Sequence, residues 1–216
     1  MAIAIALADA FDIETYDGLV AYVIAHLELD GESEAQVPTF IRQAEYRLNR
    51  LCTTPERETS IIMTTTAGEQ SVALPVDYRQ LRAARFVADD GYPLAQASLN
   101  VLHSDYSGTS GRPQAFCISE QAVHFGPMPD GEYTIYATYL ARIPPLSPAN
   151  QTNWLLSGNA DAYVYATLMQ ASVWLEDLEA ATTYRAELMS IIDEVNLQGN
   201  RYRMSGPIRM RSPVVV

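Results

Sequence analysis

Apolar residues recur at helical spacing near both ends of the chain and alternate with polar ones in the middle. Thr15 is suited to cap a first helix that Asp30-Gly31 ends, and the acidic segment 32–36 leads to Pro38 in the first turn of a second helix. Each helix carries one apolar stripe. The stripe of the first helix consists of Leu19, Val20, Val23, Ile24 and Leu27, and that of the second consists of Phe40, Ile41, Ala44, Leu48 and Leu51. The other side of the second helix is charged and carries Arg42, Glu45, Arg47 and Arg50.

From residue 59 to residue 141 the pattern is that of short β-strands separated by turn signals. β-Branched and aromatic residues predict strands at 61–66, 70–74, 84–88, 114–119, 122–125 and 133–139. Asp89-Asp90-Gly91 favours a hairpin turn, and residues 98–106 favour a short helix. Strands of this kind form an antiparallel sheet or a small sandwich.

Helical spacing returns after the proline-rich segment 143–148. Asn159 or Asp161 starts one predicted helix, and Asp177 is suited to cap a last one that carries apolar residues as far as Val195. This order predicts an α+β protein. Its expected parts are a helical bundle from residues 1–58 and 142–198, an inserted antiparallel β-sheet or sandwich at residues 59–141, and an extended C-terminal arm at residues 199–216. We expect the arm to be disordered in the free protein.

Charge is distributed unevenly along the chain, and every basic residue is an arginine. The 14 arginines and 26 acidic residues give a formal net charge of −12. Residues 1–200 carry −16, whereas the tail carries +4 from Arg201, Arg203, Arg209 and Arg211. The absence of lysine excludes a Schiff-base lysine or a P-loop lysine. The acidic body argues against a protein whose main surface binds nucleic acid.

Candidate catalytic and metal-binding residues are few. His26, His103 and His124 have no second histidine three or four positions away, so the sequence predicts neither a metal site nor a cofactor. Ser104 and Asp105 follow His103 directly, whereas the members of a catalytic triad come from separate segments. We therefore expect no enzyme activity, and we expect structural roles for His26 and His124.

The two cysteines and the start of the chain bear on its compartment. Cys52 and Cys117 lie in separate apolar contexts, which favours buried free thiols in a reducing compartment. Residues 1–8 are apolar like a signal peptide, but no basic residue precedes them and acidic residues follow at once. No apolar run has the length of a membrane span. These features predict a protein made in the cytoplasm.

Tyrosine is frequent, with 13 residues against 5 phenylalanines. Tyr133, Tyr136 and Tyr139 lie on the clearest predicted strand, where Tyr136 is an odd number of positions from each of the other two. Because side chains alternate along a strand, the three cannot all face the same way. One interpretation is that part of this set lies at a protein interface, where tyrosine is enriched. The other is an amphipathic sheet edge in a monomer.

Several motifs occur in an order that is familiar from a known family. They are Phe40-Ile-Arg-Gln-Ala-Glu45-Tyr-Arg-Leu48, Leu74-Pro75-Val-Asp77-Tyr78, Gly111-Arg-Pro113, Phe125-Gly-Pro-Met-Pro129, Tyr139-Leu-Ala-Arg-Ile-Pro-Pro-Leu-Ser-Pro148, Thr152-Asn-Trp-Leu-Leu156 and Asn159-Ala-Asp-Ala-Tyr163-Val-Tyr-Ala166. Together they resemble the head-to-tail adaptor (connector) proteins of short-tailed bacteriophages, the tail tubular protein A-like and related adaptors. The resemblance covers roughly residues 15–197 and leaves out the alanine-rich start and the arginine-rich tail.

The resemblance implies a structural virion protein without enzyme activity, located in the neck of the particle. Such adaptors form a ring, in most cases a dodecamer, which joins the portal protein to the tail nozzle or tube and continues the DNA channel. We expect DNA to pass without specific binding, and we expect no membrane partner. We further expect the arm to bind the portal through Arg201, Arg203, Arg209, Arg211, Val214, Val215 and Val216, and Tyr133, Tyr136 and Tyr139 to contact a neighbouring subunit or the tail.

Two other functions remain open at this point. One is a β-rich carbohydrate- or peptide-binding module that uses the tyrosine-bearing strand as its platform. The other is a hydrolase built on His103 or His124, which would lose its activity on a single histidine substitution without a change in assembly.

Overall fold

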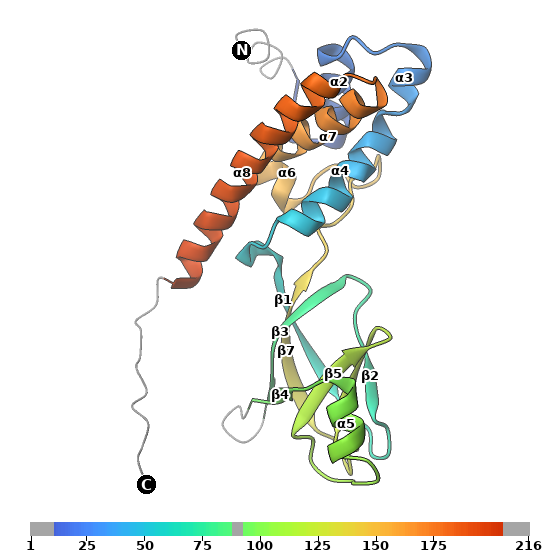
Figure 1. Ribbon diagram of the computed structural model, residues 1–216, viewed down its shortest axis with the longest axis vertical. Coiled ribbons are helices and arrows are strands. Elements are labelled where there is room, and N and C mark those ends of the chain that lie inside the picture. Colours follow the sequence, from blue (N-terminus) through green and yellow to red (C-terminus); the bar gives the residue numbers. More distant parts are fainter. Residues whose placement is uncertain (1–10, 88–92, 205–216) are drawn as a thin grey trace. The chain divides into compact units, whose positions relative to one another are not determined.

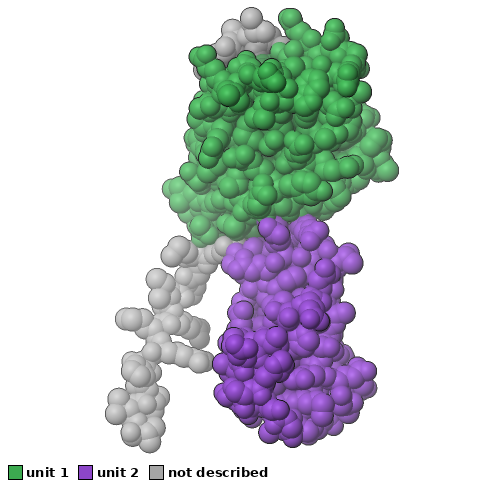
Figure 2. Space-filling view, turned by 45° about the vertical axis from the view of Figure 1, so that its right-hand side comes forward, with its two compact units in different colours: residues 1–56, 143–216 green, residues 57–142 purple. Residues whose placement is uncertain are grey.

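A computed structural model of the chain describes residues 11–87 and 93–204, with the backbone alone for residues 202–204. Seven α-helices and two β-sheets occur in this part, so the predicted α+β class is confirmed (Figure 1). The chain divides into two compact units, residues 1–56 with 143–216 and residues 57–142 (Figure 2). The predicted hairpin turn at 89–91 lies outside the described residues.

The first unit is helical. Its described helices are α2 (Tyr16–His26), α3 (Gly31–Ala35), α4 (Val37–Leu51), α6 (Trp154–Gly158), α7 (Ala160–Trp174) and α8 (Leu178–Met204). Helix α7 contains a single charged residue, Asp161, and an apolar helix of this kind is suited to the centre of a bundle. It packs against α2, α4 and α8, which confirms that helices from both ends of the chain form one bundle.

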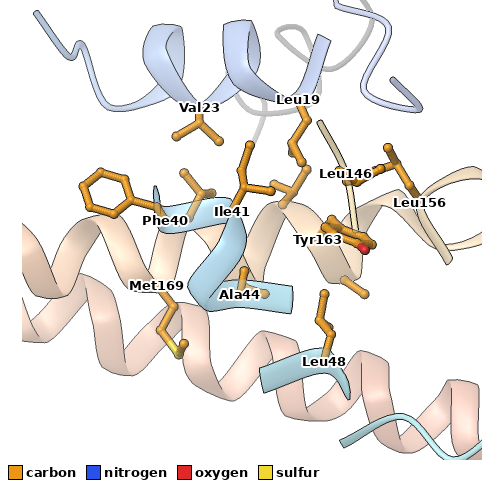
Figure 3. Packing of buried hydrophobic residues seen from close by; sticks show 14 of the residues in the cluster. Leu19, Val23, Phe40, Ile41, Ala44, Leu48, Leu146, Leu156, Tyr163 and Met169 are labelled. Atoms are coloured by element: carbon orange, nitrogen blue, oxygen red, sulfur yellow. The ribbon is translucent and has the colours of Figure 1, made fainter. Parts of the chain in front are cut away.

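The apolar stripes predicted for the first two long helices face this central helix. Leu19 and Val23 of α2, Phe40, Ile41, Ala44 and Leu48 of α4, and Tyr163 and Met169 of α7 belong to one buried cluster (Figure 3). Thr15 caps α2 as predicted, because its side chain accepts a hydrogen bond from the Gly18 amide. Proline stands in the first turn of α4, also as predicted.

The second unit contains the strands. In its first sheet, β7 (Thr134–Ala141) lies between β1 (Glu58–Thr64) and β3 (Tyr78–Phe86) and is antiparallel to both. The second sheet has the order β2 (Ser71–Ala73), β6 (Ala122–Gly126), β5 (Ala115–Ser119), β4 (Ala95–Gln96), and helix α5 (Leu99–Asp105) precedes β5. A second buried cluster fills this unit and includes Phe86, Phe116, Val123, Phe125 and Ile135.

The expectation of a purely antiparallel sheet is wrong at one edge. Strands β4 and β5 pair in parallel, with Ala95 opposite Ala115. Parallel neighbours need a crossover connection, and α5 lies in the segment that joins these two strands. Because β4 has only two residues, its sequence carries no periodicity from which the pairing could be predicted.

The last helix is longer than the sequence indicated. Helix α8 continues through Gly199 to Met204, so residues 199–204 are helical and an arm that is extended from residue 199 onward is wrong. A glycine often ends a helix, but Gly199 lies buried inside this one. A Cβ atom there would come within 2.6 Å of Pro55 Cδ and 3.3 Å of Thr54. Close packing of α8 on residues 54–55 therefore explains the glycine.

Two short helices were not predicted. The segment expected as an acidic linker forms α3, and α6 precedes α7. The side chain of Asn153 caps α6 by accepting hydrogen bonds from the amides of Leu155 and Leu156. Both helices have five residues, too few for apolar spacing to indicate a helix.

Cys52 and Cys117 are buried, as predicted, and neither forms a disulfide bond within the part of the chain that the structure describes. No helix in the described ranges is both long and apolar enough to cross a membrane. The same ranges contain no group of three or more His, Cys, Asp or Glu side chains positioned to hold a metal ion.

Candidate interaction surfaces

Tyr136 lies on the more exposed side of the three-stranded sheet. The register of β7 places it opposite Ile62 of β1 and Arg85 of β3. The Arg85 guanidinium lies 5.0 Å from the centre of the Tyr136 ring, and the Tyr136 hydroxyl donates a hydrogen bond to Ser60. Ile62 is 64% exposed. Half-buried Tyr136 thus lies in a row with an exposed apolar side chain and a cation, a composition typical of interfaces.

Tyr139 belongs to the interior of the β unit. It is 4% exposed, and its hydroxyl donates to the Asp77 carboxylate at 3.1 Å. Burial raises the pKa of its phenol, and the nearby Asp77 raises it further. Its ring lies 5.8 Å from that of Tyr78. The expectation that Tyr139 contacts another subunit is therefore wrong, because the side chain is already covered within its own chain.

Tyr133 precedes β7, so it lies neither in the row of Tyr136 nor beside Tyr139. Its hydroxyl donates to Asp130 at 2.6 Å, and its ring packs edge-on against Phe86 at 5.9 Å. The three tyrosines therefore do not form one surface. Alternation along the strand was predicted correctly for Tyr136 and Tyr139. Ile62 and Arg85 were missed, because strand pairing across tens of residues brings them to Tyr136.

The start of the predicted arm is partly visible. Arg201 is exposed in the last turns of α8, and Arg203 lies on the same helix. Arg209, Arg211, Val214, Val215 and Val216 lie outside the described residues. The helix is held to the end of α4 by Asn196, whose amide donates to the Leu51 carbonyl at 3.0 Å and accepts from the Thr53 amide at 2.8 Å.

The histidines lie apart from one another. His26 stacks on Tyr22 at 5.5 Å and shares a 3.1 Å hydrogen bond with the Tyr184 hydroxyl, and burial lowers the pKa of its imidazole. His103 is exposed on α5, where the Ser104 hydroxyl bonds to Asp105 and not to His103. His124 lies on β6. Cys117 of β5 lies opposite it in the register. The consecutive residues His103, Ser104 and Asp105 therefore do not form a triad.

Four of the motifs that carry the family resemblance supply hydrogen bonds within the helical unit. The Glu45 carboxylate accepts from the Leu146 amide at 2.6 Å, and Asn49 accepts from the Ile143 amide at 2.9 Å. Asn153 donates to the Pro144 carbonyl and to the Tyr163 hydroxyl, both at 2.8 Å. These bonds attach the segment that returns from the β unit to α4 and α7. These four motifs are therefore structural in this unit.

Glu45 is the one acidic residue of α4, and it points into this network. It is 7% exposed, and burial raises the pKa of its carboxyl group to about 6 although the Leu146 amide and Arg42 favour the charged form. The sequence had placed Glu45 on the charged outer side of the helix. In the structure the outer side of α4 carries the arginines, whereas the Glu45 carboxylate is buried on the inner side.

Comparison with known proteins adds the family. No curated protein sequence matches the chain. The family model described as SU10 adaptor protein matches residues 14–211, which includes both units and nearly every described residue. The chain belongs to the SU10 adaptor protein family.

Proposed function

We propose that this phage head-to-tail adaptor works as a ring of identical subunits, a dodecamer, that joins the portal to the tail nozzle or tube and continues the DNA channel. The observation that carries the proposal is the family match over residues 14–211, which spans the helical and the β unit. The earlier resemblance to tail tubular protein A-like adaptors favours a short-tailed phage.

The charge of the chain is suited to a channel. Residues 1–200 carry a net charge of −16, and DNA carries one negative charge per about 1.7 Å of its axis. An acidic wall repels phosphates, so DNA slides past it without being held. The formal net charge of −12 for the whole chain supports passage of DNA without specific binding.

The C-terminal arm is proposed to bind the portal. Helix α8 carries Arg201 and Arg203 in its last turns, and residues 205–216 add Arg209, Arg211 and Val214–Val216. Guanidinium groups pair with carboxylates in a planar, bidentate geometry, and the valines add apolar contact. The row of Ile62, Tyr136 and Arg85 on the β unit is proposed to contact a neighbouring subunit or the tail.

The native mass of the purified chain, alone and mixed with portal rings of the same virus, tests the ring. We expect a closed ring of subunits on the portal, measured by native mass spectrometry. A chain that stays monomeric in both conditions would contradict the proposal and favour the ligand-binding module instead.

Removal of residues 205–216 tests the arm without cutting into α8, which ends at Met204. We expect the truncated chain to keep its circular dichroism spectrum and to lose portal binding. Arg209→Ala with Arg211→Ala should weaken binding more than Arg79→Ala, which removes an exposed arginine of the β unit. Unchanged portal binding by the truncated chain would eliminate the arm as the anchor.

A further inference from the structure

Helix α4 has an exposed face that combines arginines with a tyrosine. Arg42, Tyr46 and Arg50 follow one another at four-residue spacing and therefore lie on one side of the helix. Tyr46 is 62% exposed, unlike most large apolar side chains of this unit. Arg47 borders the same face. Tyrosine and arginine are the residues most enriched in the centres of protein interfaces.

A further arginine joins this face from α8. Partial burial lowers the pKa of Arg47, and the positive charges of Arg185 and Arg50 lower it further, so each of these two arginines lies near Arg47. Within the described ranges none of Arg42, Arg47, Arg50 and Arg185 forms a salt bridge. Arg42 acts on the buried Glu45 carboxylate, so the basic face available to a partner consists of Tyr46, Arg47, Arg50 and Arg185.

An acidic depression lies on the same unit, at the start of α8. It is open, has a volume of about 330 Å³, and is lined by Asp177, Glu179, Ala180, Thr183 and Tyr184. Exposed apolar side chains adjoin its carboxylates at the turn between α7 and α8, namely Val173, Trp174, Leu175 and Leu178. The depression thus offers negative charge, an aromatic side chain and neighbouring apolar surface to a partner.

The basic face and the acidic depression lie on different flanks of α8. Arg185 is about three helical turns before Asn196, whose side chain bonds to the end of α4, so Arg185 lies on the flank toward α4. Tyr184 points about 100° away and bonds to His26 of α2. Complementary surfaces on different flanks pair two copies head to tail. Repeated contacts of this kind close into a ring when the rotation from one subunit to the next is a whole fraction of a full turn.

We propose that the face of Tyr46, Arg47, Arg50 and Arg185 binds the depression of Asp177, Glu179 and Tyr184 on a second copy of this chain. The proposal rests on the ring described above and names the surfaces through which neighbouring subunits meet. Arginine pairs with the carboxylates, and Tyr46 supplies apolar contact beside them. Duplex DNA is the other partner that a row of arginines fits, but only a second copy supplies both the opposite charge and the exposed apolar side chains.

A pair of engineered cysteines tests the contact in the full chain bound to the portal. Tyr46→Cys with Thr183→Cys places one thiol on each surface, while the native Cys52 and Cys117 are buried. Under oxidation we expect a ladder of covalent multimers on a non-reducing gel, and dimers only when the two single variants are mixed. Val76→Cys with Thr183→Cys is the control, because Val76 is 94% exposed on the β unit and should give no ladder.

Charge reversal provides a second measurement that does not depend on cysteine geometry. Arg47→Glu and Glu179→Arg should each weaken ring formation about tenfold, and the two substitutions in one chain should restore it. Arg79→Glu makes the same change of charge on the β unit and should have no effect.

The possible results separate this contact from the ring itself. A wild-type ring together with no Tyr46–Thr183 ladder and no rescue would overturn the proposed contact and leave the ring standing. Failure of the wild-type chain to assemble on the portal would overturn both. Binding of duplex DNA that Arg47→Glu abolishes would assign the basic face to DNA and overturn the contact between copies.

Discussion

Single polar residues in the helical unit hold separate segments of the chain together. Glu45 reaches Leu146, and Asn153 bonds to Pro144, Tyr163 and the first turn of α6. Burial of a polar side chain costs free energy, and hydrogen bonds to its partners are needed to offset that cost. The roles of Glu45 and Asn153 therefore exist only in the folded unit.

The raised pKa of Glu45 makes stability depend on pH. Its folded-state pKa of about 6 exceeds the ordinary 4.5, so folding favours the protonated form. This contribution is complete below about pH 4.5 and is lost as the pH rises through 6. From pH 4.5 to 7 the free energy of unfolding of the wild type should fall by about 2 kcal/mol relative to Glu45→Gln, which keeps an acceptor for the Leu146 amide.

Chemical denaturation at several pH values measures this difference. Glu187→Gln, at an exposed position of α8, is the matched control and should follow the wild type. Parallel pH profiles for the wild type and Glu45→Gln would contradict the role assigned to Glu45.

At the scale of elements, most long helices and strands were predictable from periodicity and caps. Thr15 and Asp177 cap α2 and α8, and the Asp177 carboxylate accepts from the Ala180 amide at 3.0 Å. The short elements α3, α6 and β4 were not, because five helical residues or two strand residues leave no period to detect. The end of α8 was predicted too early, because Gly199 was interpreted as the end of the helix. Its small size is instead required by close packing on Pro55, which is distant in sequence.

Substitution of Gly199 tests that packing. Alanine has a higher helix propensity than glycine, so Gly199→Ala would stabilise an unconstrained helix by about 1 kcal/mol. Here its Cβ would lie 2.6 Å from Pro55, and we expect a destabilisation of about 1–3 kcal/mol instead. Gly158→Ala in α6, with no atom within 4 Å of the added Cβ, should be neutral or stabilising. Thermal denaturation followed by circular dichroism distinguishes the two, and equal effects would contradict the packing argument.

At the scale of the molecule, each unit has its own buried cluster. Phe125 belongs to that of the β unit and Leu168 to that of the helical unit, and both are almost completely buried. Removal of a large buried side chain costs about 2–5 kcal/mol. Phe125→Ala should therefore destabilise the β unit, and Leu168→Ala the helical unit, each with little effect on the other.

Tryptophan fluorescence reports the unfolding of the helical unit, because Trp154 and Trp174 both lie in that unit. Phe125→Ala should leave the fluorescence transition unchanged and should accelerate amide hydrogen exchange in β5 and β6. Leu168→Ala should lower the fluorescence transition. A shift of that transition by Phe125→Ala would mean that the two units unfold together.

The amino-acid sequence by itself determined the order of the long helices and of most strands, the caps Thr15 and Asp177, and the uneven distribution of charge, because these depend on the residue types themselves and on neighbours within a few positions. Only the tertiary structure decided which side chains are covered. It turned Glu45 inward and left the arginine and tyrosine face of α4 outside, and it buried Tyr139 but left Tyr136 half-exposed. The physical reason is that burial depends on contacts between segments far apart in the chain, which periodicity within one segment does not specify.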